Sequence, residues 1–188
     1  MRYRYATESD ATAMSDLFAA NHHQALTERQ REEQGFVQGG LDAPALRALA
    51  ARGNLLLADD EGRVAGFLGL SAAEDVAAKS PPVQALLAAQ DSLRWEDAAL
   101  SEARWLLYGP VVVDADYRGQ GVARGLFDLA LSTASGRADA VVAFIETANR
   151  QSWRVHVEGF GMRPLGEVFA DGRTYGIVAA PVRRSVDT

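Results

Sequence analysis

Cysteine is absent from this 188-residue sequence. A chain without thiols forms no disulfide, holds no thiolate-bound metal and has no cysteine nucleophile. The absence also fits a reducing compartment. We therefore expect a cytoplasmic protein that uses neither disulfides nor a resident metal ion.

Long apolar runs are missing as well. No stretch approaches the roughly 20 apolar residues of a membrane-spanning helix. The first residues, MRYRYATESD, lack the apolar core of a signal peptide. We expect no association with a membrane.

Acidic residues outnumber basic residues in this sequence. The sequence has 19 Lys and Arg against 25 Asp and Glu, which gives a formal net charge of -6. A nucleic-acid-binding surface usually needs a basic field, so the charge predicts no nucleic-acid partner. The content of hydrophobic residues, 48%, is that of an ordinary globular protein. The length favours a single domain over residues 1–188, with 182–188 as a flexible tail.

The apolar pattern predicts a mixed α/β fold. An early strand precedes three short helices, a hairpin follows, and residues 72–104 then interrupt the pattern as an insertion. After the insertion come a strand, a helix, a strand, a short helix and a closing hairpin. The later segments are WLLYGPVVV at 105–113, a helix from 122 to about 135, AVVAFIE at 140–146, a helix at 149–158 and a hairpin over 162–180. Because proline cannot donate to a strand ladder, we expect the strand at 105–113 to bulge or splay at Gly109-Pro110.

A glycine-containing loop, RGQGVA at 118–123, joins that strand to the following helix. The first amides of a helix lack internal partners and favour an anion. Gly119 and Gly121 allow the backbone to approach phosphate oxygens, and Arg118 adds a charged fork. A pyrophosphate is therefore the expected ligand.

Two common phosphate motifs fit this loop poorly. A Walker loop requires Lys and Ser or Thr after its last glycine, whereas Gly121 is followed by Val122-Ala123. A dinucleotide fingerprint requires a third glycine, and position 124 is arginine.

The sequence resembles the GNAT superfamily of N-acetyltransferases. Its pattern Arg/Gln-x-x-Gly-x-Gly/Ala occurs as Arg118, Gly121 and Ala123, after an apolar strand and at the start of a helix. The resemblance implies a mixed, mostly antiparallel twisted sheet with a splayed parallel strand pair, flanked by helices. It also implies acetyl-CoA as cosubstrate, with its pyrophosphate on the loop and its pantetheine arm along the preceding strand. The cofactor-binding residues that it implies are Val111, Val112, Val113, Arg118, Gly119, Gln120, Gly121, Val122, Ala123, Asn149 and Ser152.

Three residues are catalytic candidates. His156 stands where the family commonly has a tyrosine, and it titrates near neutral pH, so we predict that it protonates the leaving thiolate. Glu146 ends the second parallel strand and is the predicted base, acting through water. Tyr108 precedes the expected bulge and could replace either. Each also has a structural alternative: a helix-surface or core histidine, a strand-end charge or helix-capping partner, and an aromatic packed beside the cleft.

The insertion is the candidate for substrate selection. It contains Trp95, Glu96, Asp97, Glu102 and Arg104, and Trp105 follows it directly; acidic and aromatic side chains can receive a cationic amine. The alternative is a surface excursion whose tryptophans pack into the core.

The predicted function is an acetyl-CoA-dependent N-acetyltransferase acting on a small-molecule amine, with a peptide also possible, by direct attack in a ternary complex. The alternative is a non-catalytic acyl-CoA-binding sensor or partner module. We expect a monomer or a homodimer.

Overall fold

The computed structural model describes residues 1–72, 75 and 80–183. Part of the predicted insertion (73–74 and 76–79) and most of the predicted tail (184–188) lie outside the described residues. Contacts group the chain into two compact units. The first unit comprises Met1–Leu70 and Tyr108–Ala130, and the second comprises Ser71–Leu107 and Leu131–Thr188. A single domain over 1–188 stays a prediction.

Seven strands form the main sheet, in the order β1-β2-β3-β6-β7-β9-β8. Four neighbouring pairs are antiparallel, β1 with β2, β2 with β3, β7 with β9 and β8 with β9, whereas β6 and β7 are parallel. The mixed, mostly antiparallel fold is therefore confirmed. The strands are β1 Arg2–Tyr5, β2 Leu55–Asp60, β3 Arg63–Ser71, β6 Trp105–Val113, β7 Ala140–Glu146, β8 Arg163–Ala170 and β9 Arg173–Pro181.

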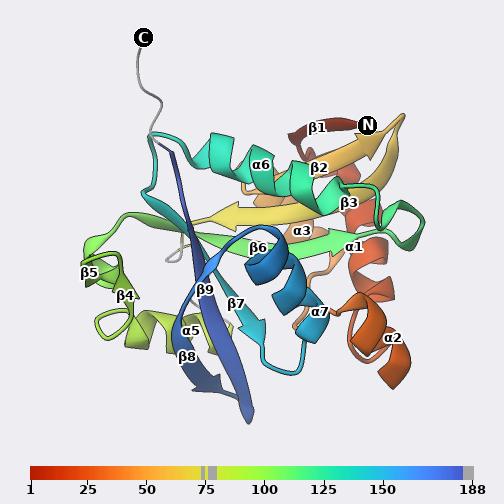
Figure 1. Cartoon of the computed structure of the whole chain (residues 1–188). Coiled ribbons are helices and arrows are strands. Elements are labelled where there is room, and N and C mark those ends of the chain that lie inside the picture. The colour runs from red at the N-terminus through yellow and green to blue at the C-terminus, as the bar shows by residue number, and fades with distance from the viewer. Residues whose placement is uncertain (73–74, 76–79, 184–188) are drawn as a thin grey trace. The chain divides into compact units, whose positions relative to one another are not determined.

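The first unit packs helices on both faces of its strands (Figure 1). Helices α1 (Ala11–Ala20) and α3 (Ala43–Ala51) cover one face through a buried cluster that includes Met14, Leu46 and Phe67. Helix α6 (Val122–Ala134) runs close to the strands, because Gly66 of β3 leaves room for the side chain of Val122. This arrangement places the start of α6 beside the end of β6.

Local sequence explains where the early helices begin. The side chain of Asp42 accepts a hydrogen bond from the Ala45 amide at 2.9 Å and starts α3. In α2 (Glu28–Gln34), the Thr27 amide donates to Gln30 Oε1 at 2.9 Å, as in a capping box. Gly35, at φ 72°, then ends α2.

Gly69 of β3 lies against the backbone of Gly109 in β6. A Cβ atom at position 69 would stand 2.5 Å from the Gly109 carbonyl oxygen, and a backbone atom cannot move aside as a flexible side chain can. We expect Gly69→Ala to lower the free energy of unfolding by about 1–3 kcal/mol. Urea denaturation measures this change, with Gly40→Ala as control because a Cβ there meets no atom within 4 Å. Equal stability of the two variants would contradict the prediction.

The second unit is built on β7, β9 and β8. Its buried cluster includes Val142, Ile177 and Trp95, and helix α5 (Pro81–Ala89) contributes Leu86. Trp95 lies in a small hairpin of β4 (Arg94–Trp95) and β5 (Ala98–Ala99). The described part of the insertion thus has one tryptophan in the core.

The parallel ladder between β6 and β7 is short. It joins Trp105–Leu107 to Ala140–Val142 in three residue pairs, and no further pair between these strands is recorded among the described residues. β6 continues to Val113 and β7 to Glu146. The ladder ends just before Gly109, whose φ is 117°, as expected for a splayed parallel pair.

Every helix within residues 1–72, 75 and 80–183 is too short or too polar to cross a lipid bilayer.

Candidate functional site

The loop between β6 and α6 presents backbone amides at the start of a helix. Gly119 and Gly121 have φ of 72° and 83°, and a Cβ atom at either position would meet no atom within 4 Å. Among the described residues, no backbone hydrogen bond is recorded from the amides of residues 119–123. The first helical bond in this region runs from the Gly125 amide to the Gly121 carbonyl, at 2.9 Å. The loop therefore has the open, electropositive character of an anion site.

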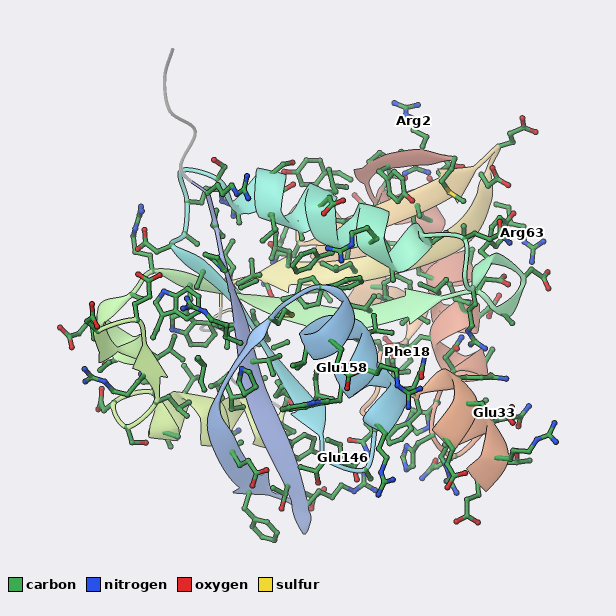
Figure 2. All side chains as sticks on the ribbon, viewed as in Figure 1. Arg2, Phe18, Glu33, Arg63, Glu146 and Glu158 are labelled. Atoms are coloured by element: carbon green, nitrogen blue, oxygen red, sulfur yellow. The ribbon has the colours of Figure 1, made fainter. Side chains whose placement is uncertain are left out.

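Side chains hold the start of this loop in place. Arg63 donates from Nη2 to Asp114 Oδ2 at 3.0 Å and to Asp116 Oδ2 at 2.6 Å. The Tyr117 hydroxyl donates to Asp60 Oδ2 at 2.9 Å. Arg63, labelled in Figure 2, comes from the β2–β3 hairpin. The loop is thus fastened to that hairpin while its glycine segment stays open.

Arg118 is half-buried at the entrance to the glycine segment. Its Nη2 donates to Oδ1 of Asn21 at 2.6 Å. Burial lowers the pKa of Arg118, but a guanidinium is so basic that it remains charged at neutral pH. Within the loop itself, Gln120 donates from Nε2 to the Asp116 carbonyl at 2.7 Å.

The end of β6 alternates between core and surface. Val112 is buried in the cluster beneath α1 and α3, whereas Val111 and Val113 are half-exposed. Val122 is buried at the start of α6 and Ala123 is half-exposed. The buried Val112 side chain thus fixes the end of the strand in the core. The backbone of the strand is still expected to pair with a pantetheine arm.

Glu146 ends β7 in the second unit (Figure 2). Its side chain is 15% exposed, and its Oε2 lies 3.8 Å from Nη1 of Arg173. On the paired strand β9, Tyr175 is its register partner. The carboxylate therefore sits at a strand end beside one cationic group.

Asn149 and Ser152 begin the helix that follows β7. Asn149 is buried, and its Oδ1 accepts a hydrogen bond from the Ser152 amide at 3.2 Å. This is the N-cap of α7 (Arg150–Trp153). The N-cap role of Asn149 thus has a direct contact, and pantetheine binding by Asn149 and Ser152 stays a prediction.

His156 lies in the turn that continues α7 and is 7% exposed. Its Nδ1 is 2.8 Å from the Ser152 carbonyl oxygen. A carbonyl only accepts hydrogen bonds, so Nδ1 carries the proton in this contact. Burial lowers the pKa of His156 below its ordinary 6.5. The imidazole is therefore neutral at neutral pH and carries no proton on Nε2, which does not suit the predicted role of general acid.

Tyr108 lies in the first unit, where β6 leaves the parallel ladder. It is 3% exposed, and its ring meets Phe127 of α6 edge-on, with ring centroids 5.8 Å apart. Burial raises the pKa of Tyr108, so its phenol stays protonated at neutral pH. These contacts are those of an aromatic packed between a strand and a helix.

Comparison with family models identifies the family of this protein. The family model described as "Acetyltransferase (GNAT) family" matches residues 13–162, most of the chain. The chain belongs to the GNAT family. The match includes the glycine loop and the candidate residues of both units. A search of curated protein sequences finds no match.

Solved structures share the GNAT fold with this chain. A GNAT acetyltransferase from Streptococcus agalactiae has a TM-score of 0.68 at 12% identity, covering 97% of this chain and 96% of that one. The Salmonella typhimurium protein yncA, solved with its cofactor acetyl-CoA, has a TM-score of 0.63 at 16% identity, covering 100% of this chain and 97% of that one. A ribosomal-protein-alanine N-acetyltransferase from Brucella melitensis has a TM-score of 0.60 at 20% identity, covering 96% and 99%.

The predicted site residues of this GNAT protein fall into two sets. The first unit contains the loop residues 118–123, the end of β6 and Tyr108. The second unit brings together Glu146, Asn149, Ser152 and His156. Sequence reasoning missed Asn21, the hydrogen-bond partner of Arg118. A polar residue just after an apolar helix usually indicates only a helix end. Nothing in the sequence therefore marked Asn21 as a partner of Arg118.

A shallow groove of about 540 Å³ lies in the described part of the insertion and its surroundings. Its lining includes one indole and four carboxylates, namely Trp95, Glu96, Asp97, Glu102 and Asp139. These groups suit a cationic ligand.

Arginines already contact several groups of this groove. Arg104 pairs with Asp139 at 2.9 Å, and Arg163 pairs with Glu96 at 3.4 Å. The guanidinium carbon of Arg163 also lies 4.4 Å from the centre of the Trp95 ring. The protein's own arginine side chains thus offset part of the negative charge of the groove, and Arg163 occupies the face of the Trp95 indole.

Proposed function

We propose that this GNAT protein is an acetyl-CoA-dependent N-acetyltransferase that acts on the amine of a small molecule. The observation that carries the proposal is the open glycine segment at the start of α6, with no recorded backbone partners for its amides among the described residues. Family membership and the acetyl-CoA bound to the Salmonella relative support the choice of cosubstrate.

Different parts of CoA are proposed to bind to different elements of the protein. The amides of Gly119, Gln120 and Gly121, with the Arg118 side chain, bind the diphosphate. The backbone of Val111–Val113 pairs with the pantetheine arm. Asn149 and Ser152, at the start of α7, are also proposed to contact the arm. The fixed hairpin contacts of the loop support this assignment, since a preorganised site loses less entropy on binding.

The proposed reaction is direct attack in a ternary complex. The amine nitrogen bonds to the thioester carbonyl carbon, the carbon–sulfur bond breaks, the amine loses a proton and the thiolate gains one. Holding both substrates in position supplies much of the rate, and no protein nucleophile is needed. Glu146 is the proposed base, through a water molecule, because its partly exposed carboxylate ends β7.

Neither buried ring is proposed as the proton donor to the thiolate. A neutral His156 with its proton on Nδ1 has none to give from Nε2. Tyr108 keeps its proton, but its ring packs against Phe127 of α6. The thiolate therefore takes its proton from solvent, and the two rings act in packing.

The test is acetyl-CoA turnover across a panel of small amines, amino acids and short peptides, followed as release of free thiol. We expect turnover with at least one small amine and a rise in melting temperature with acetyl-CoA alone. A peptide as the only acceptor would overturn the substrate class. Tight CoA binding without thiol release would instead indicate a non-catalytic acyl-CoA-binding module. No thermal shift with either CoA or acetyl-CoA would refute both functions.

A further inference from the structure

Asn21 follows α1 and is a buried polar residue with fixed geometry. Its side chain is held from one side, because Nδ2 donates to the Leu17 carbonyl at 2.9 Å. Its main-chain carbonyl accepts from the Val37 amide at 3.0 Å. The residue is only 9% exposed. These contacts leave Oδ1 in a single orientation, toward Nη2 of Arg118 at 2.6 Å.

A neutral partner distinguishes Arg118 from two other arginines of the first unit. Arg4 contacts Asp10 at 2.8 Å and Asp59 at 2.9 Å. Arg63 likewise contacts two carboxylates, those of Asp114 and Asp116. The recorded hydrogen bond of Arg118 is to an amide oxygen, which directs the guanidinium without cancelling its charge.

Asp114 also acts on Arg118 electrostatically, since its charge raises the pKa of Arg118 against the larger effect of burial. The Asp114 carboxylate is already engaged, because it accepts from Arg63 and from the Asp116 amide. Asn21 is therefore the group that orients Arg118, and Asp114 adds only a longer-range influence.

We propose that Asn21 is a positioning residue that holds the Arg118 guanidinium ready for the diphosphate of the acyl-CoA. The inference rests on the proposed function of the loop. A guanidinium has five N–H donors, so one bond to Asn21 leaves the others for phosphate oxygens. Fixing a long side chain before the ligand arrives reduces the entropy lost on binding. A carboxylate in place of the amide would still accept from Arg118, but it would lose the contact with the Leu17 carbonyl and would neutralise the guanidinium charge.

A double-mutant cycle on the whole chain tests this proposal, with acetyl-CoA as the probe in calorimetric titration. We expect Asn21→Ala to weaken acetyl-CoA binding about tenfold, as for a lost charge-assisted contact. In the Arg118→Ala background the same substitution should have no further effect, because Asn21 acts only through Arg118. Gln30→Ala is the matched control, since it removes a capping contact with Thr27 that involves neither Asn21 nor Arg118.

Asn21→Asp separates orientation from charge. It keeps an oxygen toward Arg118 and should still weaken acetyl-CoA binding at least about fivefold, because the ion pair competes with the diphosphate. This variant also serves where Asn21→Ala fails to fold, as judged by its melting curve.

The outcomes are separable. Equal losses from Asn21→Ala with and without Arg118 would show a merely structural role and overturn the proposal. Unchanged affinity in both Asn21 variants would also overturn it. If the unmodified protein does not bind acetyl-CoA at all, the proposed function fails first, and that result is visible before any variant is compared.

Discussion

Gly121→Glu is expected to abolish acetyl-CoA binding, with a loss of more than about 100-fold in affinity, since like charges a few ångströms apart repel by several kcal/mol near a protein surface. Gly121 has a φ of 83°, which disfavours any side chain, and its Cβ direction is open. A glutamate there would place its carboxylate where the amides of residues 119–123 are proposed to bind the diphosphate. Isothermal titration with acetyl-CoA measures the loss.

Gly136→Glu is the matched control for backbone strain and charge. Gly136 has a φ of 75°, is exposed, and its Cβ would meet no atom within 4 Å. It follows the opposite end of α6, so the same side chain is added away from the loop. Full affinity in this variant, beside a lost signal at position 121, is the expected result. Similar losses in both variants would mean that strain, and not the diphosphate site, explains the effect.

Local signals were sufficient to predict most elements of the fold outside residues 72–104. Asp42 starts α3 because its carboxylate satisfies a free amide, and such a contact depends on residues three positions apart. The hairpin of β8 and β9 turns at Asp171 and Gly172, both with positive φ, as the Asp-Gly pair predicts. The loop at 118–123 combined glycines, an arginine and a following helix in one short segment. Each of these features can be read without knowing what lies nearby in space.

Long-range contacts could not be predicted in the same way. Asn21 and Arg118 are 97 positions apart, and nothing in either neighbourhood indicates the other. The closeness of Gly69 to the Gly109 carbonyl is likewise a property of two strands. The chemistry of His156 also depended on folding. Its sequence position suggested an acid, whereas its burial and its contact with the Ser152 carbonyl leave it neutral.

Glu146→Gln is expected to lower kcat by about 10²-fold, the usual contribution of a positioned general base. The substitution keeps the shape of the side chain but removes its negative charge and its ability to take a proton. Because the base acts on the amine, the affinity for acetyl-CoA should stay unchanged. Steady-state kinetics with the acceptor found in the panel, together with titration of acetyl-CoA, separate the two quantities.

Arg173→Met distinguishes this catalytic role from a structural one. It removes the cation 3.8 Å from Glu146 but leaves the carboxylate in place. If Glu146 only supports the strand end through this pair, both variants should lose activity to the same extent, and the base assignment would be wrong.

Tyr108→Phe and His156→Gln complete the comparison. His156→Gln removes a buried ring that donates to the Ser152 carbonyl and should lower the melting temperature, whereas Tyr108→Phe keeps the ring against Phe127 and should change the melting temperature little. In both variants kcat should stay within about threefold, because neither ring transfers a proton. A loss of kcat in either variant as large as that in Glu146→Gln would move the proton chemistry from the strand end to that ring.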